Sequence, residues 1–298
     1  MKLVSSYWIG LVWWLSCCTG PLDSERDKLL SIIESNEKFQ KQEFAILTDT
    51  YNRLPDMSVA GIRKRVEFSR DLLAQLESID KSQLNLEDQI TLELFQFVQE
   101  DIVEQYDLQG YLNPILSDDG FHIAFAFTQD AYSFTSKEDY LNYIKVLNAY
   151  PTYVDQHIAL MREGLEKGMV QPKIILQGYE VTYDNHLVEH IEESIFYQPF
   201  LNIPDQISTA ERQELQSQGK LAVQNGAIEG YRNFSQFMTD EFVPNTRTSI
   251  GASELPNGNE FYKQRIKYYT TLELSPDSIH NLGLQEVERI RNEMQAII

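Results

Sequence analysis

Apolar residues recur along most of the chain at intervals of three to five positions, with charged and polar residues between them. This spacing puts apolar side chains on one face of an α-helix, whereas a half-buried strand requires strict alternation. The pattern predicts helices over residues 23–51, 58–80, 86–112, 136–150, 153–165 and 209–237. Pro55 and Pro151 are expected to end the first and fourth of these, because proline cannot donate the amide hydrogen that a helix interior needs.

Polar residues at the ends of these segments support the helical prediction. Ser58 and Ser136 stand where an N-cap hydroxyl would accept a backbone N–H, and Gly168 stands where a helix would end. Strand patterns are weak, because residues 121–127 and 173–176 are short apolar runs that suit an edge strand or a loop. No Gly- and Ser-rich linker divides the chain. We therefore expect an all-α, multi-helix array that forms one domain or part of one.

The last predicted helix begins with Ser275 as its N-cap and Pro276 in its first position. An apolar stripe with spacings of 3, 3, 4 and 3 then continues to the end of the chain, through Leu284, Val287, Ile290, Met294 and Ile297. Neither a glycine cap nor a polar tail follows the stripe. This pattern predicts that the chain is truncated within a larger helical structure.

Residues 1–18 have the layout of a secretory signal peptide that ends in a lipobox-like sequence. A single basic residue precedes residues 3–15, which carry no charge and are too few to span a bilayer. Cys17 and Cys18 follow, and a cysteine behind a small residue at this place resembles the cysteine that bacteria lipidate. Ser16 favours Cys17 as the lipid anchor over Cys18. The alternative is a plain cleaved signal with two incidental thiols.

The predicted organisation is therefore a leader over residues 1–18 and a truncated helical domain over residues 19–298. We expect the protein to be exported to the cell envelope and anchored to a bacterial membrane through its N-terminal lipid. If both cysteines belong to the leader, the folded domain has no thiol, because the chain has two cysteines in total. It would then use no disulfide, no cysteine-bound zinc and no cysteine nucleophile.

Composition and charge narrow the class of partner. Hydrophobic residues make up 42% of the chain, which is enough for a sizeable core and excludes general disorder. There are 25 basic and 45 acidic residues, giving a net charge of −20. That charge repels phosphate backbones, and no dense basic patch offsets it, so no nucleic-acid partner is expected.

One motif has the spacing of metal ligands. His186, Glu189 and His190 match the inverted zinc-peptidase pattern H-x-x-E-H. On a helix the two imidazoles would share one face, and Glu189 would serve as the base that activates a metal-bound water. The alternative, which we favour, is the polar face of an amphipathic helix, because no further acidic ligand stands out among the acidic residues. On that interpretation the chain binds no metal.

Several segments after residue 196 carry a family resemblance. They are Tyr197-Gln-Pro-Phe200, Ile250-Gly-Ala-Ser-Glu-Leu-Pro-Asn-Gly258, Tyr262, Thr270-Thr271, Leu274-Ser-Pro276 and Ile279-His-Asn-Leu-Gly-Leu284. This succession resembles the bacterial family called domain of unknown function 885, many of whose members are lipoproteins. The resemblance implies a larger, predominantly helical fold of about twice this length. It also implies zinc in the full-length protein, at a His-Glu-x-x-x-His segment in a later half that resembles zinc metallopeptidases.

The resemblance makes this chain the N-terminal half of such a protein, inactive alone because the zinc-binding segment lies beyond Ile298. In an intact protein the partners would be a peptide substrate and the missing C-terminal half, and Tyr262 and His280 are candidates for lining its cleft. His280 falls in the first turns of the last helix, where a structural role is the simpler interpretation. Two other functions remain open. They are a non-catalytic helical lipoprotein that binds a peptide or an envelope partner, and an independent zinc peptidase that uses the H-x-x-E-H motif.

Overall fold

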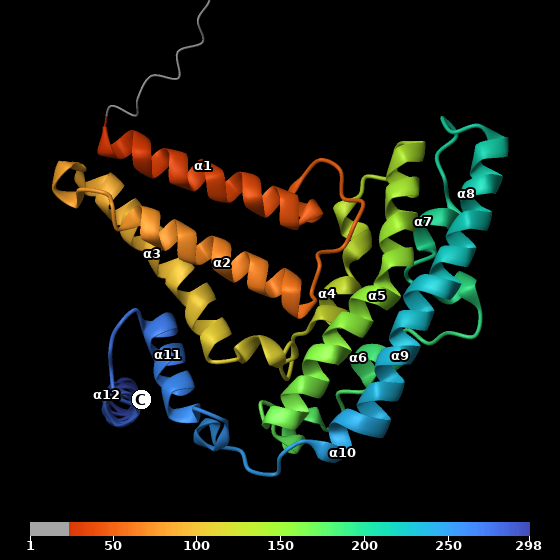
Figure 1. Ribbon diagram of the computed structural model, residues 1–298. Coiled ribbons are helices and arrows are strands. Elements are labelled where there is room, and N and C mark those ends of the chain that lie inside the picture. The colour runs from red at the N-terminus through yellow and green to blue at the C-terminus, as the bar shows by residue number, and fades with distance from the viewer. Residues whose placement is uncertain (1–23) are drawn as a thin grey trace, which may run out of the picture.

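The computed structural model of the protein describes residues 24–298, and every regular element in that range is helical (Figure 1). The predicted all-α class is thus confirmed, and two isolated bridges are the β contacts of the described chain. The helices are α1 (Glu25–Glu43), α2 (Val59–Leu76), α3 (Leu86–Asp107), α4 (Phe121–Phe125), α5 (Lys137–Lys167), α6 (Val181–Asp184), α7 (Gln198–Leu201), α8 (Thr209–Ala222), α9 (Glu229–Phe237), α10 (Val243–Asn245), α11 (Gly258–Thr270) and α12 (Pro276–Ile297).

Helices α1, α2 and α3 lie side by side and share a small core of their own (Figure 1). Its centre is formed by Leu29 of α1 and Leu72 of α2, both without exposed surface. Ser58 caps α2 as predicted, because its Oγ accepts the backbone N–H of Gly61 at 3.1 Å. A further apolar cluster joins the start of α2 to α5, through Ile62 and Leu160.

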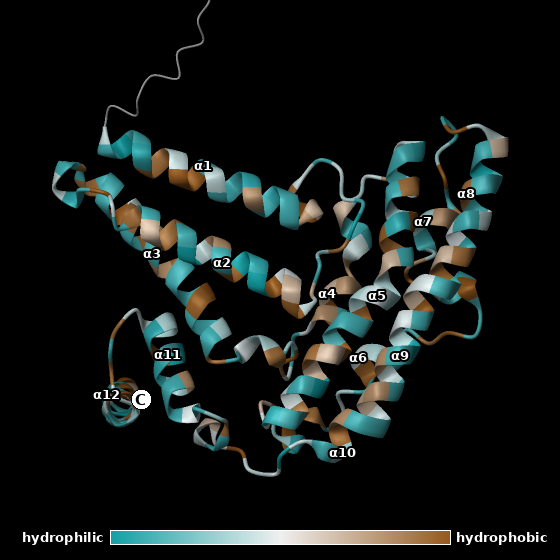
Figure 2. Cartoon of the chain, viewed as in Figure 1, coloured by the Kyte–Doolittle hydropathy of each residue, from teal (hydrophilic) through white to brown (hydrophobic). Residues whose placement is uncertain are grey.

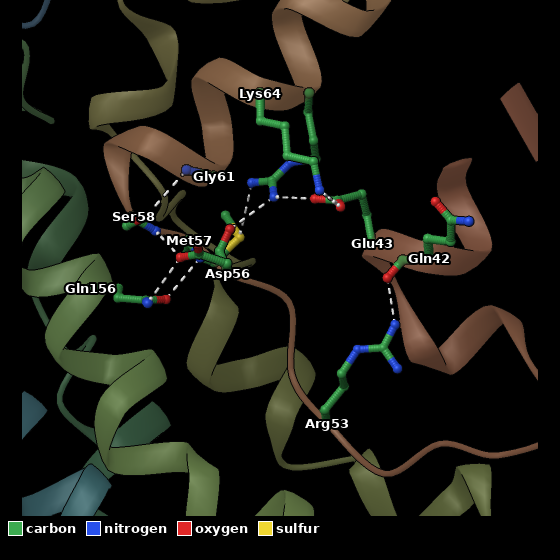
Figure 3. A network of polar contacts seen from close by, with 10 residues as sticks. Gln42, Glu43, Arg53, Asp56, Met57, Ser58, Gly61, Lys64 and Gln156 are labelled. Atoms are coloured by element: carbon green, nitrogen blue, oxygen red, sulfur yellow. Dashed lines mark hydrogen bonds and ion pairs between the residues drawn. The ribbon is translucent and has the colours of Figure 1, made fainter. Parts of the chain in front are cut away.

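Polar contacts fix the segment that leads from α1 into α2 (Figure 3). Gln156 of α5 donates to Asp56 Oδ1 at 3.0 Å and accepts the backbone N–H of Met57 at 2.7 Å. The hydrogen bond from the Ser58 backbone is the main reason that the pKa of Asp56 is lowered. Glu43 at the end of α1 pairs with Lys64 of α2 at 2.5 Å. The start of α2 is thereby tied to both neighbouring helices.

The larger core lies among α4 to α9 and is dominated by aromatic rings. Phe125 of α4 stacks on Tyr150 of α5 with their ring centroids 3.6 Å apart. Tyr143 and Tyr231 are fully buried, and their hydroxyls donate to the backbone oxygens of Phe196 and His122, respectively. Buried tyrosines need such partners, so these bonds also set the position of the short segments that carry α4 and α7.

Helix α5 continues through Pro151, so the predicted break at this residue is wrong. Proline at this position leaves the carbonyl of Leu147, four residues earlier, without its helical donor. Gly226 lies directly against that carbonyl, and a Cβ on Gly226 would stand 2.2 Å from the Leu147 oxygen. The neighbouring element thus approaches α5 closely at the carbonyl that Pro151 leaves without a helical donor. The ends of α5 follow the prediction, with a capping box at Ser136 and Asp139 and a left-handed Gly168.

The predicted helix over residues 209–237 is present and extends further, to Asn245. It is one continuous rod made of α8, α9 and α10, joined by two π-helical segments, η7 (Val223–Ile228) and η8 (Met238–Phe242). The rod packs along α5 (Figure 1). A π segment adds a residue to a turn, and the first one places Gly226 against α5.

Both weak strand patterns form helical turns in the structure. Residues 121–127 contain α4, in which Phe121 and Phe125 are one turn apart and point into the aromatic core. Residues 173–176 form the 3-10 turn η5 (Lys173–Leu176). In both segments the helical turn buries apolar side chains in the core, which are Phe121, Phe125 and Leu176. The local apolar pattern alone does not indicate this conformation.

Helices α11 and α12 extend from the rest of the molecule beside α3 (Figure 1). Ser275 caps α12 as predicted, and Pro276 occupies its first turn. No residue of α12 is buried. Its predicted apolar stripe is present but exposed to solvent. Figure 2 shows α12 end-on, with both apolar and polar residues among its turns.

Candidate ligand-binding clefts around helix α11

Helix α11 separates two hollows in the surface. The first is a groove of about 600 Å³ between α3, α11 and the segment that enters α12, lined by Glu104, Asp107, Leu108, Glu260, Lys263, Gln264, Lys267, Glu273, Leu274 and Ser275. Partial burial opposes protonation of Lys267, but the nearby Glu104 and Glu100 carboxylates outweigh it and raise the pKa of Lys267. The charged residues of the groove are thus four acids and two lysines, so its charged lining is net negative.

The second hollow is a cavity of about 620 Å³ on another side of α11, where it meets the turns after α3, α5 and α10. Its walls combine apolar side chains with three charged ones, Asp119, Arg247 and Arg265. Arg265 pairs with Asp101. The apolar part comprises Pro114, Leu116, Met169, Pro172, Ile175, Ile250, Ala252, Leu255, Phe261 and Tyr269. Gln105, Asn113 and Gln171 add polar groups to the lining. A cavity that combines apolar walls with a few fixed polar and charged groups has the general character of a small-molecule site.

Arg247 is held in this cavity by the backbone around it. Its Nε donates to the carbonyl of Val170 at 3.0 Å, and its Nη1 donates to the carbonyls of Ser249 at 2.7 Å and Gly251 at 2.9 Å. The backbone oxygen of Arg247 also accepts the N–H of Lys173 at 2.7 Å. Partial burial lowers the pKa of the Arg247 guanidinium, against the opposing effect of Glu254. An arginine remains charged in spite of such a shift.

The two predicted cleft residues lie near these hollows without lining either of them. Tyr262 is on α11, next to Phe261 of the cavity wall, and its side chain is 47% exposed. His280 is exposed on the second turn of α12, after the segment that lines the groove. The structure brings both residues to the α11–α12 region, but it does not bring them into one pocket.

The H-x-x-E-H segment is not helical. Helix α6 ends at Asp184, and the segment continues as turns into the 3-10 turn η6 (Ile191–Glu193). Glu189 and His190 are exposed, whereas the His186 ring faces Tyr231 at a centroid distance of 4.3 Å. Both interpretations of the sequence assumed a helix here. Because the segment is not helical, the two imidazoles do not share the expected face. Within residues 24–298 no group of three or more His, Cys, Asp or Glu side chains is placed to hold a metal ion.

Two further histidines are buried in the aromatic core. Nε2 of His122 lies 2.9 Å from Oγ1 of Thr182, and its Nδ1 has no partner among the described residues. His157 stacks on Phe121 at 3.9 Å, and neither of its ring nitrogens has a partner in the same range. Burial lowers the pKa of each histidine to about 3. A second histidine adds to the effect, which is His186 for His122 and His122 for His157. Both rings are therefore neutral at pH 7.

Comparison with known proteins identifies the family. The model of the family described as bacterial protein of unknown function (DUF885) matches residues 41–298. The chain belongs to this family. A solved structure described as "the putative lipoprotein from Colwellia psychrerythraea" is similar, with a TM-score of 0.71 at 20% sequence identity. That match covers 91% of this chain and 50% of the other. No curated protein matches the sequence.

The DUF885 chain thus spans about half the length of the Colwellia protein, and at this identity the likeness is one of fold. Cys17 and Cys18 lie outside the described residues, so the predicted lipid anchor stays a prediction. Among the described helices of this DUF885 member, none has the length and hydrophobicity needed to cross a bilayer.

Sequence reasoning missed Arg247 and the two buried histidines of this DUF885 chain. Arg247 stands three positions before the Ile250–Gly258 segment that carries the family resemblance, but a lone arginine has no motif. His122 stands next to an aromatic residue in the sequence, Phe121, whereas His157 stands between Gln156 and Ile158. An aromatic neighbour is a weak signal for burial, and it does not indicate which ring lacks hydrogen-bond partners.

Proposed function

We propose that this chain is the N-terminal helical part of an exported, lipid-anchored DUF885 protein whose zinc-peptidase site lies in a further part. The observation that carries the proposal is the apolar stripe of α12, none of whose residues is buried. Leu284, Val287 and Met294 are 57%, 65% and 59% exposed. Soluble proteins rarely expose a continuous apolar face of this kind unless another surface covers it.

The length comparison supports the same proposal. A protein of this fold from Colwellia psychrerythraea is about twice as long, so a second part is available to cover α12 in that protein. The description of that protein as a lipoprotein agrees with an anchor at Cys17 or Cys18 in this one. On this proposal the described helices form a scaffold and a peptide-binding surface, and the zinc belongs to the part that covers α12.

The first experiment asks whether the purified full chain is inert. We expect no stoichiometric zinc by elemental analysis and no hydrolysis of unstructured peptides, because the described residues offer no metal-binding group. His186→Ala and His190→Ala should leave both results unchanged. One equivalent of zinc that is lost in His186→Ala would instead establish the H-x-x-E-H motif as the metal site and overturn the proposal.

Two observations on the gene and the mature protein complete the test. The DNA beyond codon 298, or an adjoining frame, should encode a His-Glu-x-x-x-His segment. Intact-mass analysis of the envelope fraction should show a diacylglycerol-modified N-terminus that Cys17→Ser abolishes and Cys18→Ser does not. Unrelated DNA beyond codon 298 would favour a non-catalytic lipoprotein, for which the cavity beside α11 is the specific structural support.

A further inference from the structure

Arg247 differs from the other arginines of the chain in its surroundings. Of twelve arginines, eight lie within 4.0 Å of a carboxylate oxygen. The remaining four are Arg53, Arg63, Arg247 and Arg291, and Arg247 is the one among them that is partly buried. A partly buried cation without a paired carboxylate is unusual, because burial weakens its solvation and a partner normally compensates. It is more unusual still in a chain with a net charge of −20.

Hydrogen bonds to backbone carbonyls orient the Arg247 guanidinium but do not engage all of its N–H donors. Nε and Nη1 are occupied by the carbonyls of Val170, Ser249 and Gly251. Nη2 has no hydrogen-bond partner among the residues that the structure describes. The side chain lines the 620 Å³ cavity, so its charge is presented to a space large enough for a small molecule. A guanidinium that is held in place in this way binds an anion without the entropic cost of ordering its own side chain.

The rest of the cavity selects among anions. Leu116, Ile250 and Tyr269 stand at its mouth with 52%, 74% and 78% of their surface exposed, and the wall continues inward to Met169. Inorganic phosphate would gain nothing from these apolar walls. A carboxylate that carries an apolar group would bury the group while the carboxylate meets Arg247.

We propose that the cavity beside α11 binds a carboxylate with an apolar substituent, as found in the C-terminal residue of a peptide or in a free apolar amino acid. The carboxylate lies against Arg247, and the substituent lies between Met169, Ile250 and Phe261. The site is complete within this chain, so the proposal does not depend on zinc or on a second part of the protein.

Asp119 distinguishes the two possible ligands, a free amino acid and the C-terminal residue of a peptide. Its carboxylate lines the same cavity, and Oδ1 accepts the backbone N–H of Gly120 at 2.7 Å. The ammonium of a free amino acid would be attracted to Asp119, whereas the acylated nitrogen of a peptide carries no charge. Comparison of L-leucine with N-acetyl-L-leucine therefore shows which source the site prefers.

The experiment measures binding of N-acetyl-L-leucine and L-leucine to the purified full chain by calorimetry, with N-acetyl-L-leucinamide as the uncharged comparison. We expect at least one of the two carboxylates to bind about tenfold more tightly than the amide, because the amide cannot form a charged pair with Arg247. Equal binding of the amide, or no binding of either carboxylate at millimolar concentration, would overturn the proposal.

Variants at Ile250 test the site without disturbing the fold. Replacing Arg247 itself would release three backbone carbonyls and risk unfolding the loop, but Ile250 is exposed at the mouth of the cavity. Ile250→Glu places a negative charge in the wall of the cavity, where it repels the bound carboxylate and should weaken binding about tenfold beyond the loss of the apolar contact. The matched variant Ile250→Gln has the size of glutamate and loses the same apolar contact without adding a charge, so it should bind about tenfold more tightly than Ile250→Glu. Equal affinities for the two variants would contradict a carboxylate site.

Discussion

At the scale of single residues, His157 is one of two buried histidines, with His122, that make the stability of the protein sensitive to acid. Its ring is 2% exposed, and both nitrogens lack partners among the described residues. Burial lowers its pKa from 6.5 to about 3, so the native state keeps it neutral while the unfolded chain takes up a proton below pH 6.5. Stability is unaffected by this group above pH 6.5 and is lost progressively as the pH falls from 6.5 towards 3.

His157→Phe should remove this acid sensitivity, because phenylalanine keeps the stack on Phe121 and cannot be protonated. By pH 5 the wild-type histidine lowers the free energy of unfolding by roughly 2 kcal/mol relative to pH 7. Urea unfolding at pH 7 and pH 5 should show a smaller difference for the variant than for the wild type. His280→Gln is the matched control, since His280 is exposed and its replacement should leave the difference unchanged. An equal pH dependence in His157→Phe would refute this assignment.

At the scale of elements, the contact between the first π segment and α5 leaves no room for a side chain at Gly226. Gly226→Ala would place a methyl group 2.2 Å from the Leu147 backbone oxygen. Residues 226 and 147 both belong to helical segments, so neither backbone can move aside as a flexible side chain could. We expect a loss of about 2 kcal/mol in the free energy of unfolding, as for overpacked cores. Gly283→Ala on α12 is the control, because nothing lies within 4 Å of its Cβ position and no loss is expected. Thermal unfolding of the two variants measures the difference.

The helices could be predicted from sequence where local signals decide them. Ser58, Ser136 and Ser275 all cap the helices they were expected to cap, because a cap depends on residues three positions away. The predicted break at Pro151 was wrong because α5 is packed along its length against α8, α9 and the π segment between them, and these contacts are distant in sequence. The same holds for residues 121–127, whose helical turn depends on burial against α5 and α9.

The candidate site was less predictable than the fold. Tyr262 and His280 were chosen on the family resemblance; they lie on α11 and α12 but line neither hollow, so their role stays a prediction. Arg247 could not be recognised from the sequence. It stands out because it has no carboxylate partner, and this can be seen only in the folded chain. The H-x-x-E-H motif shows the converse, because three matching residue types without a helix beneath them do not form a shared ligand face.

At the scale of the whole molecule, the exposed face of α12 should cause self-association. We expect the purified chain to form concentration-dependent oligomers in sedimentation velocity, because association buries the apolar stripe. The triple variant Leu284→Gln, Val287→Gln and Ile290→Gln should be monomeric, with an unchanged melting temperature because none of these residues is buried.

Glu288→Gln is the matched control for that experiment, because it changes α12 at an exposed residue outside the apolar stripe and should leave association intact. A wild-type chain that stays monomeric at high concentration would contradict the prediction. It would also weaken the proposal that a further part of the protein covers this helix.

The division of the apolar core has a consequence for how the molecule opens. Helix α1 contributes Leu29 and Ile32 to the small cluster and nothing to the large aromatic one. The start of α2, in contrast, is joined to α5 through Ile62 and Leu160. Helix α1 can therefore detach while the aromatic core remains closed, so local fraying begins there and global denaturation need not follow.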